Sequence, residues 1–359
     1  MSEQKKLNVA IIGQGRSGRD IHGVYFLSDK NVHYQVKYVV ELDAARRAIA
    51  AEMYPGCTVL EDYRDLYDKS DVDLVVNASF SDLHYPVTKD LLEHGKNVLV
   101  EKPFARNHHE CATLIQTAKE HGVYLQVFQQ TFLAPFYLKT LEVLESGILG
   151  KPEQISIHYN GFGRRWDWQT LQKRMGGSVY NTGPHPIGLA MDLLGFGDDI
   201  QVAFSRLGCG LTSGDAEDYA KIILVAPNKP VIDLEISSID AYSDYNLKIQ
   251  GSKGCFKTTT SSYTMKYIVD GENPERPVQE ATLRGENDKP IYCGEKLITH
   301  AESADLQGSV FHESVAKFYD DMYYAITEGK AMYTDPEKIM RLIGVIERVH
   351  AENPLPLKY

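Results

Sequence analysis

Short runs of apolar, often β-branched residues alternate with amphipathic segments over the first 130 residues of the chain. The runs bounded by turn residues predict buried strands, and the segments with a period near 3.6 predict helices. The expected strands are residues 7–12, 34–41, 72–79, 97–103 and 123–128, and the expected helices are 44–53, 85–95 and 108–122, with another after the first strand. This alternation with short connections predicts a parallel sheet that is covered by helices on both faces.

The pattern changes after residue 130. A helix over 136–150 is followed by strands with alternating polar and apolar positions, which is typical of an antiparallel sheet with one exposed face. We expect these strands at 152–162, 199–206, 218–226, 230–240, 244–250 and 254–258. Residues 259–308 are polar and predict irregular structure, and two helices near 309–328 and 335–350 close the chain. The prediction is an α/β protein with a doubly wound parallel sheet over 1–130 and a second α/β domain over 131–359.

Composition narrows the functional classes. The 359 residues include 38 Lys and Arg against 49 Asp and Glu, a formal net charge of −11, whereas nucleic-acid and anionic-membrane surfaces need clustered basic residues. No apolar run reaches the length of about 18 residues that a membrane span requires. The five cysteines are scattered without a Cys-x-x-Cys pair, which favours free thiols and predicts no metal site. We therefore expect a cytoplasmic protein without nucleic-acid or membrane partners.

The first predicted strand runs directly into the motif Gly13-x-Gly15-x-x-Gly18. Glycines at this spacing allow a tight turn and a close approach of the backbone to a pyrophosphate, whose charge the N-terminus of the following helix stabilises. We expect this loop, including Arg16 and Ser17, to bind a dinucleotide. The alternative is a glycine turn that binds nothing.

Glu41 lies at the end of the second predicted strand, about 20 residues after Gly18. A carboxylate at this place can accept hydrogen bonds from the ribose hydroxyls, and it repels a 2′-phosphate. The expected cofactor is therefore NAD. Arg46 and Arg47 follow shortly afterwards and keep NADP as the less favoured alternative, and Glu41 could also be an ordinary surface carboxylate.

Three further motifs accompany the glycine loop in chain order: NASFSDLH at 77–84, EKP at 101–103 and GGSVYNTGPH at 176–185. Together with that loop they resemble the glucose–fructose oxidoreductase, inositol dehydrogenase and rhizopine-catabolism (Gfo/Idh/MocA) family over essentially the whole chain. The resemblance implies an N-terminal Rossmann domain and a C-terminal α/β domain with a large open, mostly antiparallel sheet. It also implies hydride transfer between a nicotinamide cofactor and a ring carbon of a sugar, inositol or related polyol.

The resemblance assigns roles to individual residues. Lys102 matches the lysine beside nicotinamide and substrate, and His185 matches the catalytic histidine. Oxidation of an alcohol requires removal of the hydroxyl proton, for which a histidine is suited near neutral pH, and a lysine can stabilise the developing negative charge. The alternatives are a solvated Lys102 and a His185 that only caps a helix. The remaining positions that the resemblance places near the cofactor are Glu101, Ser79, His84 and Gln129.

Asn181 departs from the family pattern, which commonly has Asp four residues before the histidine. A carboxylate would orient the imidazole and raise its basicity, whereas an amide keeps the hydrogen bonding without the charge. Gly188 replaces a second common acid, and Asp192 lies too far along the following helix to substitute. We expect Asn181 to contact a substrate hydroxyl or to hold His185. Because the carboxylate is missing, either other groups tune the basicity of His185 or the chemistry is weaker than in typical members.

The segment GRRWDWQ at 163–169 supplies further candidates for the substrate site. An indole face suits a sugar ring, while Arg and Asp suit hydroxyl or carboxylate groups. We expect Arg164, Trp166 and Asp167 to contact the substrate, with Tyr159 on the preceding strand as a further candidate. An aromatic loop that serves as a core or subunit contact is the alternative.

Three functions remain open at this point. The first is an NAD-dependent sugar or polyol dehydrogenase. The second is a glycoside-processing enzyme of the same family that uses its cofactor transiently through a 3-keto sugar, and the third is a sensor that has lost the chemistry. An open sheet in the second domain would bury apolar surface by pairing, so we also expect a homodimer or homotetramer formed through that sheet.

Overall fold

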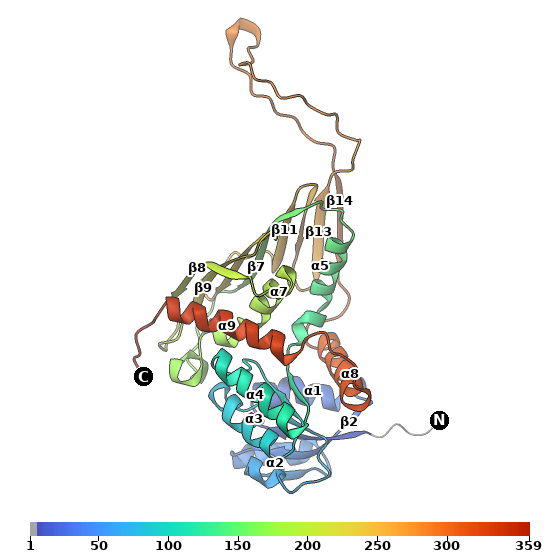
Figure 1. Ribbon diagram of the computed structural model, residues 1–359, viewed down its shortest axis with the longest axis vertical. Helices are drawn as coiled ribbons and strands as arrows, with labels where there is room; N and C mark the ends of the chain where they lie inside the picture. Colours follow the sequence, from blue (N-terminus) through green and yellow to red (C-terminus); the bar gives the residue numbers. More distant parts are fainter. Residues whose placement is uncertain (1–5) are drawn as a thin grey trace, which may run out of the picture.

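The computed structural model describes residues 6–359, and it contains two β-sheets arranged along the long axis of the molecule (Figure 1). The first sheet has six parallel strands in the order β3-β2-β1-β4-β5-β6, which is the order of a doubly wound dinucleotide-binding fold. Its strands are β1 Leu7–Ile12, β2 Tyr34–Val40, β3 Thr58–Leu60, β4 Leu74–Asn77, β5 Val98–Val100 and β6 Leu125–Val127. The associated helices are α1 Val24–Leu27, α2 Ala44–Met53, α3 His84–Glu93 and α4 His108–His121. The parallel sheet predicted for the first half is confirmed, and the short strand β3 is an addition to the prediction.

Both faces of this sheet are buried, which explains why its strands read as continuous apolar runs. Val9 and Ile11 of β1 point into the core shared with α1, α2 and α8 (Glu313–Glu328). Ala10 and Ile12 point into the opposite core, shared with α3, α4 and α9 (Pro336–Glu352). The polar loops that follow the strands are therefore brought to one edge of the sheet.

The second sheet has eight strands in the order β14-β13-β12-β11-β7-β10-β9-β8, and only β7 and β10 among the neighbouring pairs are parallel. Helices α5 (Pro135–Glu145), α6 (Ser178–Asn181) and α7 (Pro184–Leu194) are also part of this half (Figure 1). The strands are β7 Pro152–Asn160, β8 Gln201–Gly208, β9 Tyr219–Val225, β10 Val231–Ser237, β11 Leu247–Gly251, β12 Gly254–Thr258, β13 Ser262–Tyr267 and β14 His300–Asp305. The mostly antiparallel sheet that was predicted is thus confirmed.

The face of this sheet that the helices leave open is largely polar. Lys221 on β9 pairs with Asp233 and Glu235 on β10, and the ring of His158 stacks on that of Tyr245. These charged and aromatic groups are only partly exposed and satisfy one another across neighbouring strands. The apolar surface expected on this face is therefore interrupted by an ion-pair network.

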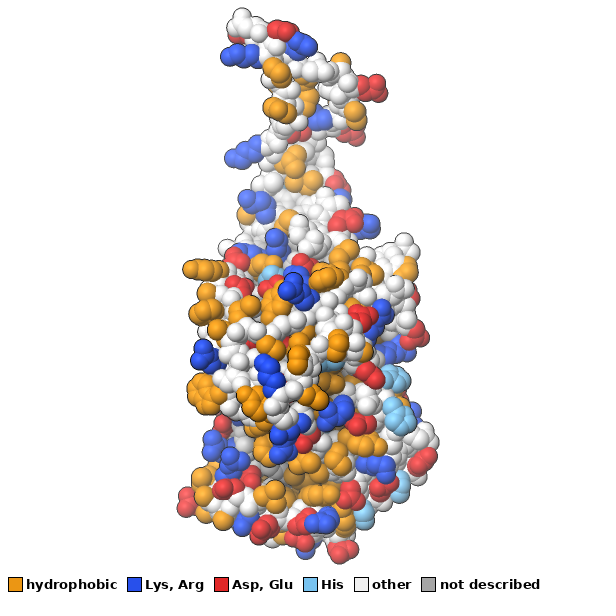
Figure 2. Space-filling view, turned by 90° about the vertical axis from the view of Figure 1, so that its left-hand side faces the viewer, with side chains coloured by type: hydrophobic (Ala, Val, Ile, Leu, Met, Phe, Trp, Pro, Cys, Tyr) orange, Lys and Arg blue, Asp and Glu red, His pale blue; other side chains and the backbone are white. Residues whose placement is uncertain are grey.

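Residues 259–308 differ from the irregular structure that was predicted for them. They contain β13 and β14, which pair as an antiparallel hairpin at the edge of the sheet. All six residues of β14 are exposed, so the strand lacks the apolar alternation on which its prediction would depend. Residues 268–299 form an arm that projects from the body of the molecule (Figures 1 and 2), and its exposed apolar side chains include Val278, Ile291 and Tyr292.

The last two helices carry the chain back to the first sheet. The ring of Tyr319 on α8 stacks on Tyr25 of α1, with centroids 4.5 Å apart. Helix α9 lies beside α4 and β8, and the side chain of Asp335 accepts a hydrogen bond from the N–H of Lys338 and so caps the helix. No helix within residues 6–359 is long and apolar enough to cross a membrane.

Candidate active site

The glycine loop lies between β1 and the wide helical turn Gly18–Gly23 that leads into α1. Gly13 has a φ of +88°, and a Cβ on this residue would lie 2.6 Å from the carbonyl oxygen of Ala78. A Cβ on Gly18 would lie 1.9 Å from the carbonyl oxygen of Gly13. A Cβ on Gly15 would meet nothing within 4 Å, so the backbone there borders open space. The first and third glycines are needed by the turn itself, and the second leaves the approach for a pyrophosphate free.

Glu41 follows β2 and is only 8% exposed. Its Oε2 accepts a hydrogen bond of 2.7 Å from the N–H of Gln14, and its Oε1 accepts one of 3.0 Å from the N–H of Asp43. Nη1 of Arg46 lies 3.9 Å from the same carboxylate. The interpretation of Glu41 as an ordinary surface carboxylate is therefore wrong, because both oxygens are engaged beside the glycine loop.

Hydrogen bonds of its own residues fix the loop after β4. Ser79 donates a hydrogen bond of 2.7 Å from its Oγ to Oδ1 of the buried Asn77. Nδ1 of His84 lies 2.7 Å from the carbonyl oxygen of Pro103, and Nε2 lies 3.3 Å from that of Ser79. Burial lowers the pKa of His84, so a neutral ring donates from Nδ1 to Pro103. His84 thereby ties the loop after β4 to the EKP loop, and any contribution that it makes to the cofactor site passes through these two loops.

Glu101 follows β5 and is 3% exposed. Its carboxylate accepts a hydrogen bond of 3.0 Å from the N–H of Lys102 and lies 3.1 Å from Nε2 of His22. Burial alone would raise the pKa of Glu101, but the hydrogen bond with His22 and the charge of Lys102 lower it to about 2. Glu101 is therefore ionised at neutral pH and packed beneath the lysine.

Two side chains of the first half donate to carbonyl oxygens around His185. Nζ of Lys102 donates a hydrogen bond of 2.8 Å to the carbonyl oxygen of Asn181. Nε2 of Gln129, which follows β6, donates one of 3.2 Å to the carbonyl oxygen of Pro184. The structure thus brings Lys102, Gln129 and His185 together, as the predicted site requires.

His185 lies in the first turn of α7 and is partly buried, and its Nδ1 lies 2.6 Å from Oγ1 of Thr131. Burial, followed by the nearby charge of Lys102, lowers the pKa of His185 to about 3, so the ring is neutral at pH 7. The helix cap at this end is Gly183, without a side-chain hydrogen bond. The interpretation of His185 as a helix cap is therefore wrong.

Asn181 does not orient the imidazole of His185. Its Oδ1 accepts a hydrogen bond of 2.9 Å from Nε2 of Gln169, while Thr131 holds the histidine. A Cβ on Gly188 would lie 2.9 Å from the ring of Phe132, so that position faces the core. The carboxylate of Asp192 accepts hydrogen bonds from the hydroxyls of Tyr137 and Tyr333. It therefore does not replace the missing acid beside His185, as its position along the helix predicted.

A small polar cavity of about 80 Å³ adjoins Asn181. Its walls carry hydroxyl, amide, guanidinium and carboxylate groups, which suit a hydroxylated ligand. Arg165 and Glu217 contribute charged side chains to this wall, which also includes Asn181 and Ser178. The remaining lining residues are Gln169, Thr170, Gly177, Thr182, Thr212, Asp218 and Ser238.

The loop between β7 and α6 places its side chains differently from the prediction. Trp166 is 79% exposed and Arg164 is exposed, whereas Arg165 is half-buried and lines the polar cavity. Asp167 pairs with Arg165 at 2.5 Å and caps a short helical turn. Tyr159 lies on the helix-covered side of β7 and packs against the core. A direct substrate contact remains a prediction for Arg164, Trp166, Asp167 and Tyr159.

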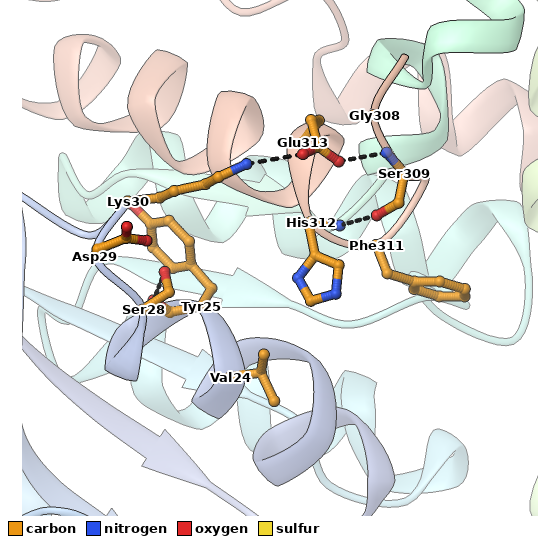
Figure 3. A pocket seen from close by; sticks show the side chains of 10 residues that line it. All are labelled: Val24, Tyr25, Ser28, Asp29, Lys30, Gly308, Ser309, Phe311, His312 and Glu313. Atoms are coloured by element: carbon orange, nitrogen blue, oxygen red, sulfur yellow. Dashed lines mark hydrogen bonds and ion pairs between the residues drawn. The ribbon is translucent and has the colours of Figure 1, made fainter. Parts of the chain in front are cut away.

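A second groove, of about 390 Å³, lies between α1 and the start of α8 (Figure 3). Lys30 and Glu313 form an ion pair across it at 2.9 Å, and the N–H of Ser309 also donates to Glu313. Its lining residues include none of the cofactor or substrate candidates. The groove therefore lies apart from the candidate residues Lys102 and His185.

Residues 7–129 match the model of the NAD-binding Rossmann fold of the Gfo/Idh/MocA oxidoreductases, and residues 142–351 match the model of their C-terminal α/β domain. The chain belongs to the Gfo/Idh/MocA oxidoreductase family. It is an oxidoreductase-family protein with an NAD(P)-binding Rossmann domain.

Several known proteins resemble this family member along most of its length. The NADP(+)-dependent scyllo-inositol 2-dehydrogenase IolW of Bacillus subtilis is 24% identical over 95% of this chain and 92% of its own. The 2,7-anhydro-N-acetylneuraminate hydratase of Mediterraneibacter gnavus is 25% identical over 82% of this chain and 78% of its own. The crystal structure of KijD10, a 3-ketoreductase from Actinomadura kijaniata in complex with NADP and TDP-benzene, has a TM-score of 0.77 at 18% identity and covers 97% of this chain and 98% of that one, a likeness that shows the fold.

The residues at the carboxyl edge of the first sheet fit a nicotinamide dinucleotide. Gly15 leaves open space at the pyrophosphate position, and the buried Oε1 atoms of Gln14 and Gln129 have no hydrogen-bond partner among residues 6–359. Such buried acceptors can take a hydrogen bond from a bound ligand, and the carboxamide of nicotinamide carries a donor. The exposed Arg16 and half-buried Ser17 belong to the same loop, and the charge of Arg16 reaches Lys102.

Sequence reasoning missed three functional candidates, which are Thr131, Gln169 and His22. Thr131 follows Gln129 after the last strand of the first sheet, so its place at the carboxyl edge was a usable signal. The contact between Gln169 and Asn181 depends on how the loop after β7 folds back. His22 reaches Glu101 across 79 residues of sequence, a pairing that no local pattern indicates.

Proposed function

We propose that this chain is an NAD(P)-dependent dehydrogenase or reductase that acts on a ring carbon of a sugar, inositol or related polyol. The observation that carries the proposal is the neutral His185, fixed by Thr131 and lying next to the ammonium group of Lys102. The polar cavity beside Asn181 supports a hydroxylated substrate. The inositol dehydrogenase among the relatives agrees with this substrate class.

The chain's own residues supply acid–base chemistry and charge stabilisation. The nicotinamide cofactor, when bound, accepts or donates the hydride. For oxidation, Nδ1 of His185 donates to Oγ1 of Thr131, which leaves the lone pair of Nε2 free to take the hydroxyl proton of the substrate. Lys102 stabilises the negative charge that develops on the substrate oxygen. For reduction, the same groups act in the opposite direction.

We propose NAD as the preferred cofactor, because a 2′-phosphate would meet the buried carboxylate of Glu41. Arg46, 3.9 Å from that carboxylate, is the residue that would favour NADP instead. Direct titration of the protein with NADH and NADPH, followed by protein fluorescence, decides between the two.

One screen tests the proposed reaction. Absorbance at the nicotinamide band is followed with NAD⁺ and NADP⁺ across inositols, aldoses and glycosides, using the wild-type chain and the variant with Lys102→Ala and His185→Ala. We expect turnover with at least one polyol or sugar and a loss of at least about 10³-fold in the double variant. Unchanged turnover in the double variant, or no binding of either nicotinamide, would overturn the proposal. Retained sugar binding without any turnover would instead support the sensor.

A second candidate function is a reaction without net redox change, through a transient 3-keto sugar. The specific observation in its favour is the similarity to a protein named as a hydratase. In this case product forms while the nicotinamide absorbance returns to its starting value. Mass spectrometry of the product beside a constant absorbance would therefore distinguish the two reactions.

We also propose that the chain forms a homodimer or homotetramer through the second sheet. The projecting arm of residues 268–299 exposes Val278, Ile291 and Tyr292, which a second subunit would cover. The polar open face implies that charged contacts contribute beside apolar ones. Light scattering at micromolar concentration is expected to give a multiple of the 40.4 kDa chain mass, and a monomeric mass would contradict this.

A further inference from the structure

A buried chain of hydrogen bonds leads from α8 to the EKP loop. The hydroxyl of Tyr319 lies 2.7 Å from Nδ1 of His22, and Nε2 of His22 lies 3.1 Å from Oε1 of Glu101. Oε2 of Glu101 accepts a hydrogen bond of 3.0 Å from the N–H of Lys102. His22 and Tyr319 are fully buried, so water does not replace any of these partners. Three segments that are far apart in sequence thus meet beneath one lysine.

Chemistry fixes the direction of the hydrogen bonds in this chain. Glu101 is ionised at neutral pH and can only accept, so Nε2 of His22 carries the proton that is donated to it. Nδ1 of His22 then accepts from the hydroxyl of Tyr319, which keeps its proton because burial raises the pKa of this tyrosine well above its usual value. The imidazole is therefore held in a single tautomer from both sides.

The lysine above this chain is in surroundings that disfavour its charge. Burial lowers the pKa of Lys102, the charges of Arg16 and Arg165 lower it further, and the carboxylate of Glu101 opposes them. The other titratable groups that face the chain are His84 beside Glu101, His185 beside Lys102, and Tyr25, Tyr34 and Tyr54 beside Tyr319. Glu101 is thus the anion on which the protonation of Lys102 depends.

We propose that His22, held by Tyr319, is a positioning residue that keeps Glu101 ionised and fixed beneath Lys102, and thereby keeps the lysine charged and in place for the reaction. The inference rests on the role given to Lys102 in the proposed function. His22 acts only through Glu101, since its ring is fully buried and its two nitrogens are both engaged within the chain of hydrogen bonds.

Competitive labelling with a trace of acetic anhydride tests this inference without substrate or cofactor. The acetylation of Lys102 is followed against pH by peptide mass spectrometry, and its midpoint reports the pKa of the amine. In His22→Leu, which leaves Glu101 without its donor, we expect the midpoint to fall by about one unit, because an opposite charge nearby typically shifts a pKa by about 1–3 units. In His22→Gln, whose amide can replace Nε2–H, we expect a midpoint near that of the wild type. In Tyr319→Phe we expect an intermediate shift.

Tyr34→Phe is the matched control, because the hydroxyl of Tyr34 donates to the backbone carbonyl of Tyr319 at 2.7 Å in the same aromatic core without touching His22. Thermal unfolding of each variant shows whether it folds. If His22→Leu does not fold, the labelling of Tyr319→Phe decides the test. An unchanged Lys102 midpoint in a folded His22→Leu or Tyr319→Phe variant would overturn the inference. A shifted midpoint in a chain that turns over no sugar or polyol would leave the inference intact and count against the proposed function alone.

Discussion

Oγ1 of Thr131 lies 2.6 Å from Nδ1 of His185 and holds the ring, a role for which Asn181 was a candidate. The two residues come from different elements, Thr131 from the turn after β6 and His185 from the start of α7. A neutral hydroxyl fixes the ring without raising its basicity as a carboxylate would. The site therefore depends on geometry and on the charge of Lys102, and less on an anion behind the imidazole.

The first prediction concerns this hydroxyl. Replacement Thr131→Val keeps the size of the side chain but removes the group that orients His185. We expect kcat to fall by about 10-fold to 100-fold, which is a part of the roughly 10²–10⁴ that positioned acid–base catalysis contributes. Steady-state kinetics should show KM nearly unchanged. Thr140→Val is a control, because its buried hydroxyl bonds to a carbonyl of its own helix; an equal loss of kcat in both variants would contradict the assignment.

Replacement Asn181→Asp restores the residue that is common in the family. Because Asn181 contacts Gln169 and not His185, we expect kcat to change by less than about fivefold, in contrast to Thr131→Val. The added carboxylate would lie near Lys102, whose Nζ already contacts this residue's backbone, and should raise the pKa of the lysine. The pH profile of kcat is the measurement. A gain of 100-fold would show that Asn181 governs the base after all.

The three glycines of the loop should respond differently to substitution. Gly15→Val adds atoms only to open space, so we expect an unchanged melting temperature and a loss of at least about tenfold in NADH affinity. Gly18→Ala forces a Cβ against the carbonyl of Gly13 and should lower the free energy of unfolding by about 1–3 kcal/mol. Fluorescence titration and thermal unfolding together separate these effects. Normal NADH binding by Gly15→Val would place the cofactor elsewhere.

Glu41 should set the choice between the two nicotinamide cofactors. In Glu41→Ser the carboxylate that repels a 2′-phosphate is gone, and Arg46 remains nearby. We expect the ratio of the NADPH to the NADH dissociation constant to fall by at least about tenfold. Isothermal titration with both cofactors measures it, with Asp43→Ser as the neighbouring control. An unchanged ratio would remove Glu41 from cofactor selection.

The depressed pKa of His185 predicts a pH dependence of stability. The value of about 3 in the folded chain compares with about 6.5 in an unfolded one. Between these values the unfolded chain binds a proton that the folded chain does not, so the free energy of unfolding falls as the pH drops from about 6.5 towards 3. From pH 7.5 to pH 5 this residue should remove about 1–2 kcal/mol.

Urea unfolding of the wild type and His185→Gln at these two pH values isolates that contribution. The variant should lose less stability on acidification than the wild type does, while other histidines contribute equally to both. An identical loss in the two proteins would show that His185 is not held neutral by the fold.

The sequence was most informative where a pattern is local. The apolar runs of the first sheet and the glycine loop follow from burial on two faces and from backbone sterics. Both were predicted, although β4, β5 and β6 are shorter than the predicted strands and β3 was missed. The β13–β14 hairpin was missed because its second strand has no buried side, so no alternation marks it. Alternation of apolar and polar residues arises where one face of a strand is buried, so an edge strand without a buried face shows no such pattern.

The predicted site shows the same division. Lys102, Gln129 and His185 could be placed together because strand ends meet at one edge and because the motifs resemble a known family. The partner of His185 could not be derived, since Thr131 reaches it only through the packing of α7 against the turn after β6. Asn181 stands at the position where the family commonly has an acid, but its side chain accepts a hydrogen bond from Gln169 and does not contact His185.

The return of α8 to the first sheet has a consequence for biosynthesis. Tyr25, Tyr34 and Phe128 pack against Phe318 and Tyr319, which leave the ribosome some 190 residues after the last strand of that sheet. Until then the aromatic face of the nascent Rossmann domain is uncovered, and His22 lacks the hydroxyl of Tyr319 as its hydrogen-bond partner. A chain cut near residue 130 would keep this face open, so its expression should require a chaperone or end in aggregation that the full-length chain avoids.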